Sequence, residues 1–440
     1  MCTVPTSQAS VTQRTGRAGR VAPGACYRLF SRGALEAMPA RPIPEIQRTA
    51  LETTCLQTCN MTEDSVQDFL SRAMDPPPEE SVAIALDRLE ELGAIENINT
   101  GQTLSPLGRL LSDLPLDPAT GKMLITGCVM KCLDPVLTAA ACFSSRNLFY
   151  APLGERDEAR EIRRSFCDNS DLMATVRAYN AFYDMVNEKG WGEARAWATD
   201  NFISVAAVTS ITSVRSQLLN ELLKIGLVNR RDLEPRIRRR NVLRYDASVN
   251  ENSNNESLFA AVWATALPGN LCARRQMGNF GTLRTRMEDH TGLHPSSVAF
   301  YRKPPKKEEN VKLPGWFFYH EMVLSSQVFL RNCTSMNPEQ IMLFGGNSLK
   351  PLSLPGDTTN KFILDDWIVV GSRCEDSLEF LSTIRREINA AIALKVMNPR
   401  KPLPESSDDI IEAVSHTFNI LDERDKPQYA GNENEEDVMK

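Results

Sequence analysis

Residues Gln13 to Arg20, with the sequence QRTGRAGR, carry the residue types with the most direct chemical meaning in this chain. Arg14, Arg17 and Arg20 recur every three residues, and a guanidinium group is a planar fork that binds oxyanions. Glycine lets the backbone approach a ligand closely, and a glutamine can orient a water molecule. The segment therefore predicts a surface that faces phosphate groups.

This octet resembles motif VI of superfamily 2 helicases, in the form found in the DEAH/RHA (DExH) group. The resemblance implies that Gln13 orients the attacking water near the γ-phosphate of ATP. It also implies that Arg17 and Arg20 act as arginine fingers, while Arg14 has a structural role. The alternative for these residues is a basic loop that faces solvent.

The resemblance places this motif near the end of the second of two RecA-like domains, whereas here it lies close to Met1. Neither the P-loop pattern GxxxxGK[ST] nor a D-E-x-H tetrapeptide occurs in the sequence. Without them, phosphoryl transfer has no positioning machinery. We expect the C-terminal portion of an ATP-dependent RNA helicase, without RecA-like domain 1. Such a chain binds RNA, on the 3′ side of a single strand, and does not hydrolyse ATP by itself. ATP and Mg²⁺ are expected cofactors of the full-length enzyme only.

The composition indicates a multi-domain globular chain of 440 residues, 42% of them apolar. Its net charge of −6 argues against bulk electrostatic binding to nucleic acid, so that any RNA contact must be local. No apolar run approaches the length of a membrane span, and the first residues do not resemble a secretory signal, which favours an intracellular location in cytoplasm or nucleus. The eleven cysteines form no metal-binding knuckle and are expected to be reduced core residues.

Residues 1–50 have a local net charge of +5 and are interpreted as a remnant of the second RecA-like domain. A buried terminal strand is expected within 21–30, from Val21, Cys26, Tyr27, Leu29 and Phe30. Residues 51–117 are expected to form a winged-helix domain with a structural role. Its signals are an apolar helical pattern that ends at Gly93, a short wing over 95–104 and the helix start Ser105-Pro106.

Residues 118–275 predict an all-α bundle, and their order and motifs resemble the ratchet, or helicase-associated, domain of the same group. That resemblance implies a long helix lying along single-stranded RNA. Tyr179, Phe182 and Tyr183 have helical spacing, which favours core positions over base stacking.

Residues 276–399 change to β-type patterns and resemble the OB-fold β-barrel of the RNA-helicase-A-like subgroup, closed by an amphipathic helix after Asp376. Barrels of this kind bind single strands by a basic groove with stacking aromatics. The expected RNA contacts are Arg274, Arg275, Tyr301, Arg302 and Lys303. For the basic cluster 236–240, a phosphate-tracking surface and a solvated charged loop remain equal alternatives.

The last forty residues carry a net charge of −7, so 400–440 is expected to be an acidic tail that is disordered from Gly431 to Lys440. His294 and His320 lack partners at metal-ligand spacing, and hydrogen-bonded turn histidines without a metal site are expected. The predicted fold class is multi-domain α+β: a RecA-like remnant, a winged helix, an all-α ratchet bundle and a C-terminal OB-fold β-barrel. Two other functions remain open, namely an RNA-binding adaptor derived from a helicase and a helical scaffold that binds no nucleic acid.

Overall fold

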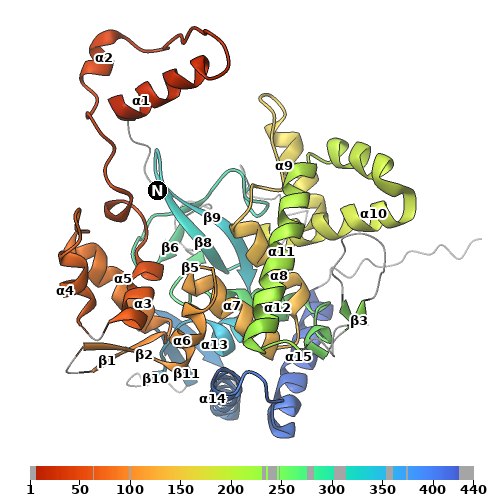
Figure 1. Cartoon of the computed structure of the whole chain (residues 1–440). Coiled ribbons are helices and arrows are strands. Elements are labelled where there is room, and N and C mark those ends of the chain that lie inside the picture. The colour runs from red at the N-terminus through yellow and green to blue at the C-terminus, as the bar shows by residue number, and fades with distance from the viewer. Residues whose placement is uncertain are drawn as a thin grey trace, which may run out of the picture. The chain divides into compact units, whose positions relative to one another are not determined.

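A computed structural model describes residues 6–62, 64–98, 101–229, 234–235, 245–246, 248–274, 282–301, 314–352, 360–372 and 375–425 (Figure 1). The chain divides into two units, and each is described by itself. The first comprises residues 1–118 and 321–331, and the second comprises residues 119–320 and 332–440.

The N-terminal segment of the first unit is helical. It contains α1 (Gln8–Thr15), η1 (Gly16–Gly19), α2 (Arg32–Glu36) and η2 (Glu45–Gln47). The Ser7 hydroxyl caps α1 by accepting from the Ser10 amide. Backbone hydrogen bonds from Gln8 to Pro39 (2.9 Å) and from Ala9 to Ala40 (3.1 Å) join the start of α1 to the end of the segment. The first turn of α1 is therefore bound to residues 39 and 40, and the octet 13–20 begins near the other end of this helix.

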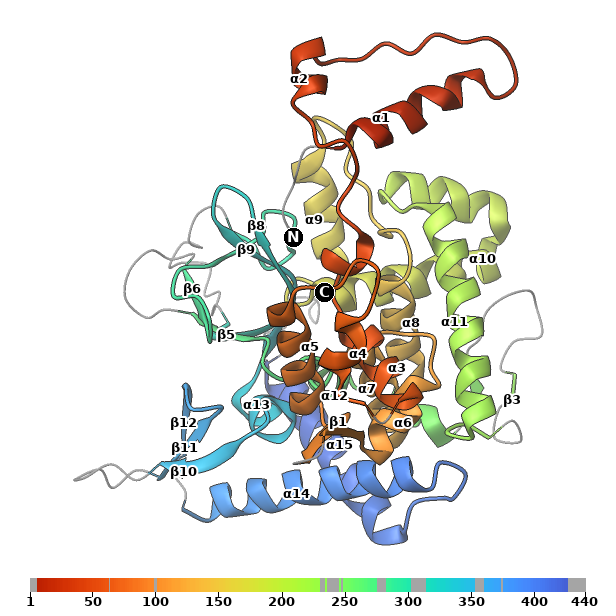
Figure 2. The same ribbon diagram turned by 60° about the vertical axis from the view of Figure 1, so that its left-hand side comes forward.

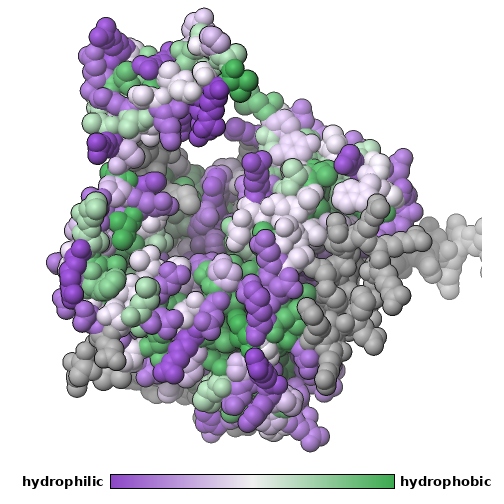
Figure 3. All heavy atoms as spheres, viewed as in Figure 1, coloured by the Kyte–Doolittle hydropathy of each residue, from purple (hydrophilic) through white to green (hydrophobic). Residues whose placement is uncertain are grey.

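The strand expected within 21–30 does not form. Val21, Tyr27 and Leu29 are almost fully exposed instead, and Figure 3 shows hydrophobic side chains (green) between hydrophilic ones (purple) at the surface of this segment. A strand is stabilised by hydrogen bonds to neighbouring strands, and no strand is assigned within residues 6–50. The prediction was therefore wrong for this chain, because apolar composition alone does not make a strand.

The rest of the first unit contains three helices, a hairpin and a fourth helix. These are α3 (Glu52–Met61), α4 (Val66–Ser71), α5 (Glu79–Glu91), β1 (Ile95–Ile98), β2 (Gly101–Leu104) and α6 (Pro106–Ser112). α5 ends before Gly93, which has a φ of +78°, and the Ser105 hydroxyl caps α6 by accepting from the Gly108 amide at 3.0 Å. Both local signals in the sequence predicted these boundaries correctly.

Helices dominate the second unit. The first six are α7 (Pro118–Val129), α8 (Leu133–Phe143), α9 (Arg156–Phe166), α10 (Asp171–Asp200), α11 (Val205–Ile225) and α12 (Glu256–Ala264). α8 and α11 lie side by side (Figure 1, Figure 2). α10 is interrupted at Gly190, whose φ of +85° requires glycine. Tyr179, Phe182 and Tyr183 are at most 3% exposed, which confirms the prediction that they belong to the core.

A five-stranded sheet has the order β6-β5-β8-β9-β7. Its strands are β5 (Leu271–Arg274), β6 (Leu283–Thr285), β7 (Gly292–Leu293), β8 (Trp316–Leu324) and β9 (Val328–Met336). Its two edges meet, because Leu283 in β6 and Thr291, just before β7, exchange backbone hydrogen bonds of 2.8 and 2.9 Å. The sheet thus closes on itself as a small barrel. β5 pairs with β6 and β8, although it precedes residue 276, where the sequence placed the start of this domain.

A separate three-stranded sheet has the order β10-β11-β12. It is formed by β10 (Leu349–Leu352), β11 (Asn360–Leu364) and β12 (Ile368–Ser372), whereas the sequence interpretation assigned Ile368 to Val370 to the barrel. Phe362 of this sheet packs with Met342 of α13 (Pro338–Phe344) and Leu381 of α14 (Glu375–Met397). The remaining short elements are β3 (Glu234–Pro235), β4 (Tyr245–Asp246) and η4 (Ser248–Asn250).

The acidic segment after residue 400 is not simply a tail, which corrects the expectation from composition. α15 (Glu405–Asp425) packs against α12 and α14 and buries Ile411, Val414 and Phe418. These positions form one helical stripe, and Glu405, Asp409 and Glu412 of the same helix are exposed. The predicted disorder of 431–440 lies outside the described residues. No helix in the described ranges is long and apolar enough to cross a membrane.

Candidate nucleic-acid interface

The residues expected to face ATP lie in the first unit. Gln13 is in the last part of α1, Arg17 is in η1, and Arg20 follows η1 directly. All three are exposed. Their spacing of four and then three residues keeps them near one face of this helical segment, so they can contact one ligand together. No described residue of the second unit is required for that arrangement.

Arg274, one of the expected RNA contacts, lies at the end of β5 and is half-buried. Its Nε donates to the Pro314 carbonyl at 3.0 Å, and its guanidinium lies 5.6 Å from the ring centre of Phe317. Burial lowers the pKa of Arg274, while the nearby Cys272 and Tyr301 act in the opposite direction. Arg275, Arg302 and Lys303 lie outside the described residues, as does the cluster 236–240.

Tyr301 is partly exposed at the end of the loop 294–301. The guanidinium carbon of Arg164 lies 4.5 Å from the centre of its ring, a cation–π contact. Arg164 also binds the backbone just before Tyr301. Its Nε donates to the Val298 carbonyl at 2.8 Å, and its Nη2 donates to the Phe300 carbonyl at 2.7 Å. A partly exposed tyrosine ring that a guanidinium group holds on one face is suited to a nucleic acid, because its other face can stack on a base.

Two more arginines of α9 bind the same loop. Arg160 and Arg163 donate to the carbonyls of Pro295 and Ser296, at 3.5 and 3.2 Å. Neither arginine was among the RNA contacts predicted from the sequence. Their spacing of three and four residues puts Arg160, Arg163 and Arg164 on one helical face, and this was the available signal. Their partners are more than 130 residues away and could not be inferred from spacing.

Asp171, the first residue of α10, binds this loop from another side. Its carboxylate accepts from the Val298 amide (2.8 Å), the Ser297 hydroxyl (2.7 Å) and the Cys333 amide of β9 (2.9 Å). The side chain is 1% exposed, and Arg163 forms an ion pair with it at 3.4 Å. A buried carboxylate is stable when it is paired and fully hydrogen-bonded, as this one is. The Asp171 carboxylate, at the start of α10, thus connects α9, the barrel strand β9 and the loop 294–301.

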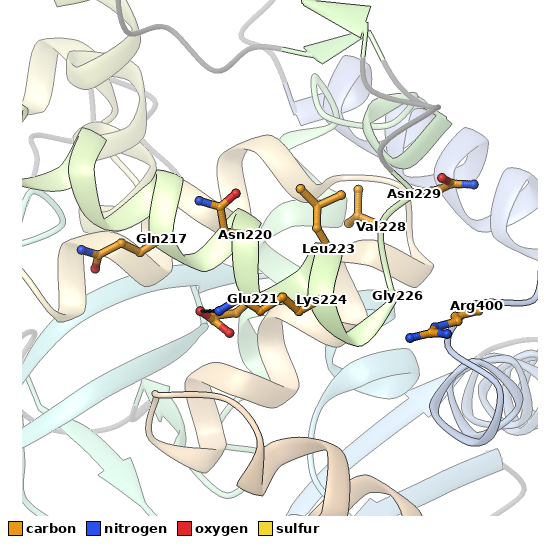
Figure 4. A pocket seen from close by; sticks show the side chains of 9 residues that line it. All are labelled: Gln217, Asn220, Glu221, Leu223, Lys224, Gly226, Val228, Asn229 and Arg400. Carbon is orange, nitrogen blue, oxygen red and sulfur yellow. Dashed lines mark hydrogen bonds and ion pairs between the residues drawn. The ribbon is translucent and has the colours of Figure 1, made fainter.

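A groove of about 670 Å³ lies at the end of α11, and Figure 4 shows its lining. Gly226 ends α11 with a φ of +91°, and Arg400 packs directly over it, in the space where a Cβ would stand. The polar lining residues are Gln217, Asn220, Glu221, Lys224, Asn229 and Arg400. Amide and cationic groups on one helix surface can bind a phosphate backbone.

The histidines take different positions. The His294 ring bonds the Ser296 hydroxyl at 2.7 Å, which confirms a turn histidine. His320 instead stacks on Phe143, with ring centres 4.1 Å apart. Most of the described cysteines are buried; burial raises the pKa of Cys55, Cys128 and Cys142 to about 12, so these thiols stay protonated.

Comparison with known proteins finds two family models in this chain. Residues 117–175 match the helicase associated domain (HA2), ratchet-like, and residues 260–348 match the oligonucleotide/oligosaccharide-binding (OB)-fold. The second match contains the barrel strands and Tyr301, and it also includes β5 and Arg274.

The chain is also similar to curated proteins over most of its length. It is 29% identical to the DExH-box ATP-dependent RNA helicase DExH1 of Arabidopsis thaliana, over 94% of this chain and 39% of that protein. It is 31% identical to the ATP-dependent DNA/RNA helicase DHX36 of Mus musculus, over 89% of this chain and 37% of that protein. For DExH3 of Arabidopsis thaliana the values are 31%, 91% and 31%. The chain therefore spans less than two-fifths of the length of these relatives.

Proposed function

Because the chain belongs to the DEAH/RHA group of DExH-box helicases, as a C-terminal portion, we propose that it binds single-stranded RNA and does not hydrolyse ATP by itself. In a longer enzyme with both RecA-like domains, this portion would hold the 3′ side of the strand during ATP-driven translocation or remodelling. The names of the relatives support an ATP-dependent activity for such an enzyme.

One observation carries the proposal for RNA. Tyr301 is partly exposed and contacts the guanidinium group of Arg164, and it shares with the half-buried Arg274 the domain that matches the OB-fold model. In a chain with a net charge of −6, this local grouping of cations and an aromatic ring is what a single strand needs. We assign the phosphate contact to Arg274 and the base contact to Tyr301. We propose RNA contacts for Arg275, Arg302 and Lys303 as well, because they directly follow these two residues in the sequence.

For ATP, the residues present fit one side of a γ-phosphate site. The exposed side chains of Gln13, Arg17 and Arg20 match the motif that orients water and supplies arginine fingers. In the proposed full-length enzyme, ATP and Mg²⁺ would be held mainly by the P-loop and DExH box, which this sequence does not contain. A bound nucleotide would supply the transferred phosphoryl group, and these three residues would orient water and stabilise negative charge.

The other regions receive structural or accessory roles. We assign residues 51–117 to a winged-helix domain that links motor and ratchet, on the support of its helix and hairpin order and of its acidic helix α5. The groove at the end of α11 is a second surface for RNA, which agrees with the long RNA-tracking helix that the family resemblance implies.

The proposal is tested with the purified chain and a fluorescently labelled single-stranded RNA. We expect Arg274→Ala and Tyr301→Ala to weaken binding, Tyr301→Ala by roughly 5- to 150-fold, which corresponds to one lost base stack. Arg177→Ala is the matched control, because Arg177 pairs with Glu256 in the same unit. The chain should show no ATP turnover in the same mixtures. Equal affinities for all variants, or rapid ATP hydrolysis, would contradict the proposal.

A further inference from the structure

We propose that α9 and Asp171 form a clamp that presets Tyr301 for stacking on a base of single-stranded RNA, with Arg164 as its principal positioning residue. This inference rests on the proposed function and goes beyond it. It assigns a specific positioning role to α9, a helix within the region that matches the helicase associated domain.

The loop 294–301 is bound to α9 through its backbone carbonyls. Four of its backbone carbonyls, those of Pro295, Ser296, Val298 and Phe300, accept from arginines of α9. Hydrogen bonds from charged donors are stronger than neutral ones. A loop with four such bonds to one helix face has little freedom to move.

The same loop is also bound to Asp171, through the Val298 amide and the Ser297 hydroxyl. Asp171 accepts from the Val298 amide and the Ser297 hydroxyl, and it also accepts from Cys333 in β9. Val298 is therefore held at both its amide, by Asp171, and its carbonyl, by Arg164. This double attachment lies three residues before Tyr301, so it fixes the direction in which the chain reaches the ring.

The guanidinium group of Arg164 is fully engaged within the protein. Each of its three guanidinium nitrogens already has an acceptor. Nη1 donates to the Glu161 carboxylate at 3.4 Å, while Nε and Nη2 donate to carbonyls of the loop. Its side chain is only 19% exposed. The group is therefore occupied in holding the loop and one face of the Tyr301 ring. A preset ring loses less conformational entropy when a base stacks on it, which increases affinity.

The positioning role is tested first without RNA, by hydrogen–deuterium exchange of the peptide that covers 294–301. Arg164→Ala should raise exchange at the amides of 298–301. Arg164→Lys should do the same, because a single ammonium group cannot bridge two carbonyls and cover the ring. Arg156→Ala is the matched control, an exposed arginine at the start of the same helix. Unchanged exchange in both Arg164 variants would overturn the clamp.

The stacking role is tested by a double-mutant cycle in single-stranded RNA binding. If Arg164 acts through Tyr301, Arg164→Ala and Arg164→Lys each weaken binding, and Arg164→Ala combined with Tyr301→Ala is no weaker than Tyr301→Ala alone. Additive losses, or full binding by Arg164→Lys, would show a direct charge contact and overturn the inference. If the unmodified chain binds RNA but Arg164→Ala binds equally well, only this inference fails. If the unmodified chain binds no RNA, the proposed function fails and the stacking role fails with it.

Discussion

At the scale of single residues, the arginines of this chain have different roles that depend on their surroundings. Arg164 binds backbone carbonyls, Arg274 is half-buried beside the Phe317 ring, and Arg17 is exposed. Among the described arginines, Arg215 is the most deeply buried, at 2% exposure, where it pairs with Asp134 at 2.6 Å and contacts Thr138 and Tyr179. Counting basic residues along the sequence therefore overestimates the positive charge available to RNA.

The Arg215–Asp134 pair gives a stability prediction. Asp134→Ala should lower the free energy of unfolding by about 3–5 kcal/mol, because it leaves a buried guanidinium without its carboxylate. Glu221→Ala removes the exposed pair with Lys224 and should cost less than about 1 kcal/mol. Urea unfolding followed by circular dichroism measures both values. Equal losses in the two variants would be incompatible with a buried pair that joins α8 and α11.

Lys122 on α7 gives a pH prediction. Burial, assisted by the positive charge of Arg385, lowers its pKa to about 8, whereas an unfolded lysine titrates near 10.5. Below pH 8 both states are protonated, and the folded state bears the full cost of the buried charge. Between about pH 8 and 10.5 the unfolded state binds more protons, so this contribution to stability rises with pH, by about 3 kcal/mol.

The comparison variant is Lys122→Met, which cannot titrate at this position. Its advantage in free energy of unfolding over the unmodified chain should shrink by about 3 kcal/mol between pH 7 and pH 10.5. The difference between the two proteins cancels the titration of the buried cysteines. A difference that stays constant over this range would show that Lys122 is not desolvated.

At the scale of elements, local signals predicted boundaries well. Ser105 and Gly93 cap their helices as expected, and the helical spacing of Tyr179, Phe182 and Tyr183 placed them in the core. Elements that depend on distant partners were not predictable. The apolar run 21–30 has no described strand to pair with, and the bonds of α9 to the loop 294–301 span more than 130 residues. Arg274 and Tyr301 were named from the sequence as RNA contacts, which stays a prediction, whereas the contacts of Arg164 and Asp171 with the loop 294–301 were not predicted.

α15 shows how composition can hide an element. Its many acids indicated a tail, yet Phe418 is fully buried and lies 6.1 Å from the ring of Phe344. We predict that Phe418→Ala lowers the free energy of unfolding by about 3–5 kcal/mol. Ile420→Ala, a similar truncation two residues later at a site that is 40% exposed, should cost less than about 1 kcal/mol. Thermal unfolding of both variants distinguishes a packed helix from an acidic tail, for which the two losses would be equal.

At the scale of the whole molecule, a chain with a net charge of −6 carries its described candidate RNA contacts in one unit. The second unit, which holds the helical region, contains Arg274, Tyr301 and the α11 groove. The exposed octet 13–20 belongs to the other unit. We therefore expect that RNA binding and the arginine-finger role can be separated, and that binding uses few phosphate contacts.

The most direct measurement is the salt dependence of the affinity of the unmodified chain for single-stranded RNA, by fluorescence anisotropy. We predict that the logarithm of the affinity falls linearly with the logarithm of the salt concentration, and that Arg274→Ala reduces the slope by about 0.7, which corresponds to one phosphate contact. Tyr301→Ala should lower the affinity without changing the slope. No binding at low salt, or an affinity that does not depend on salt, would contradict the account.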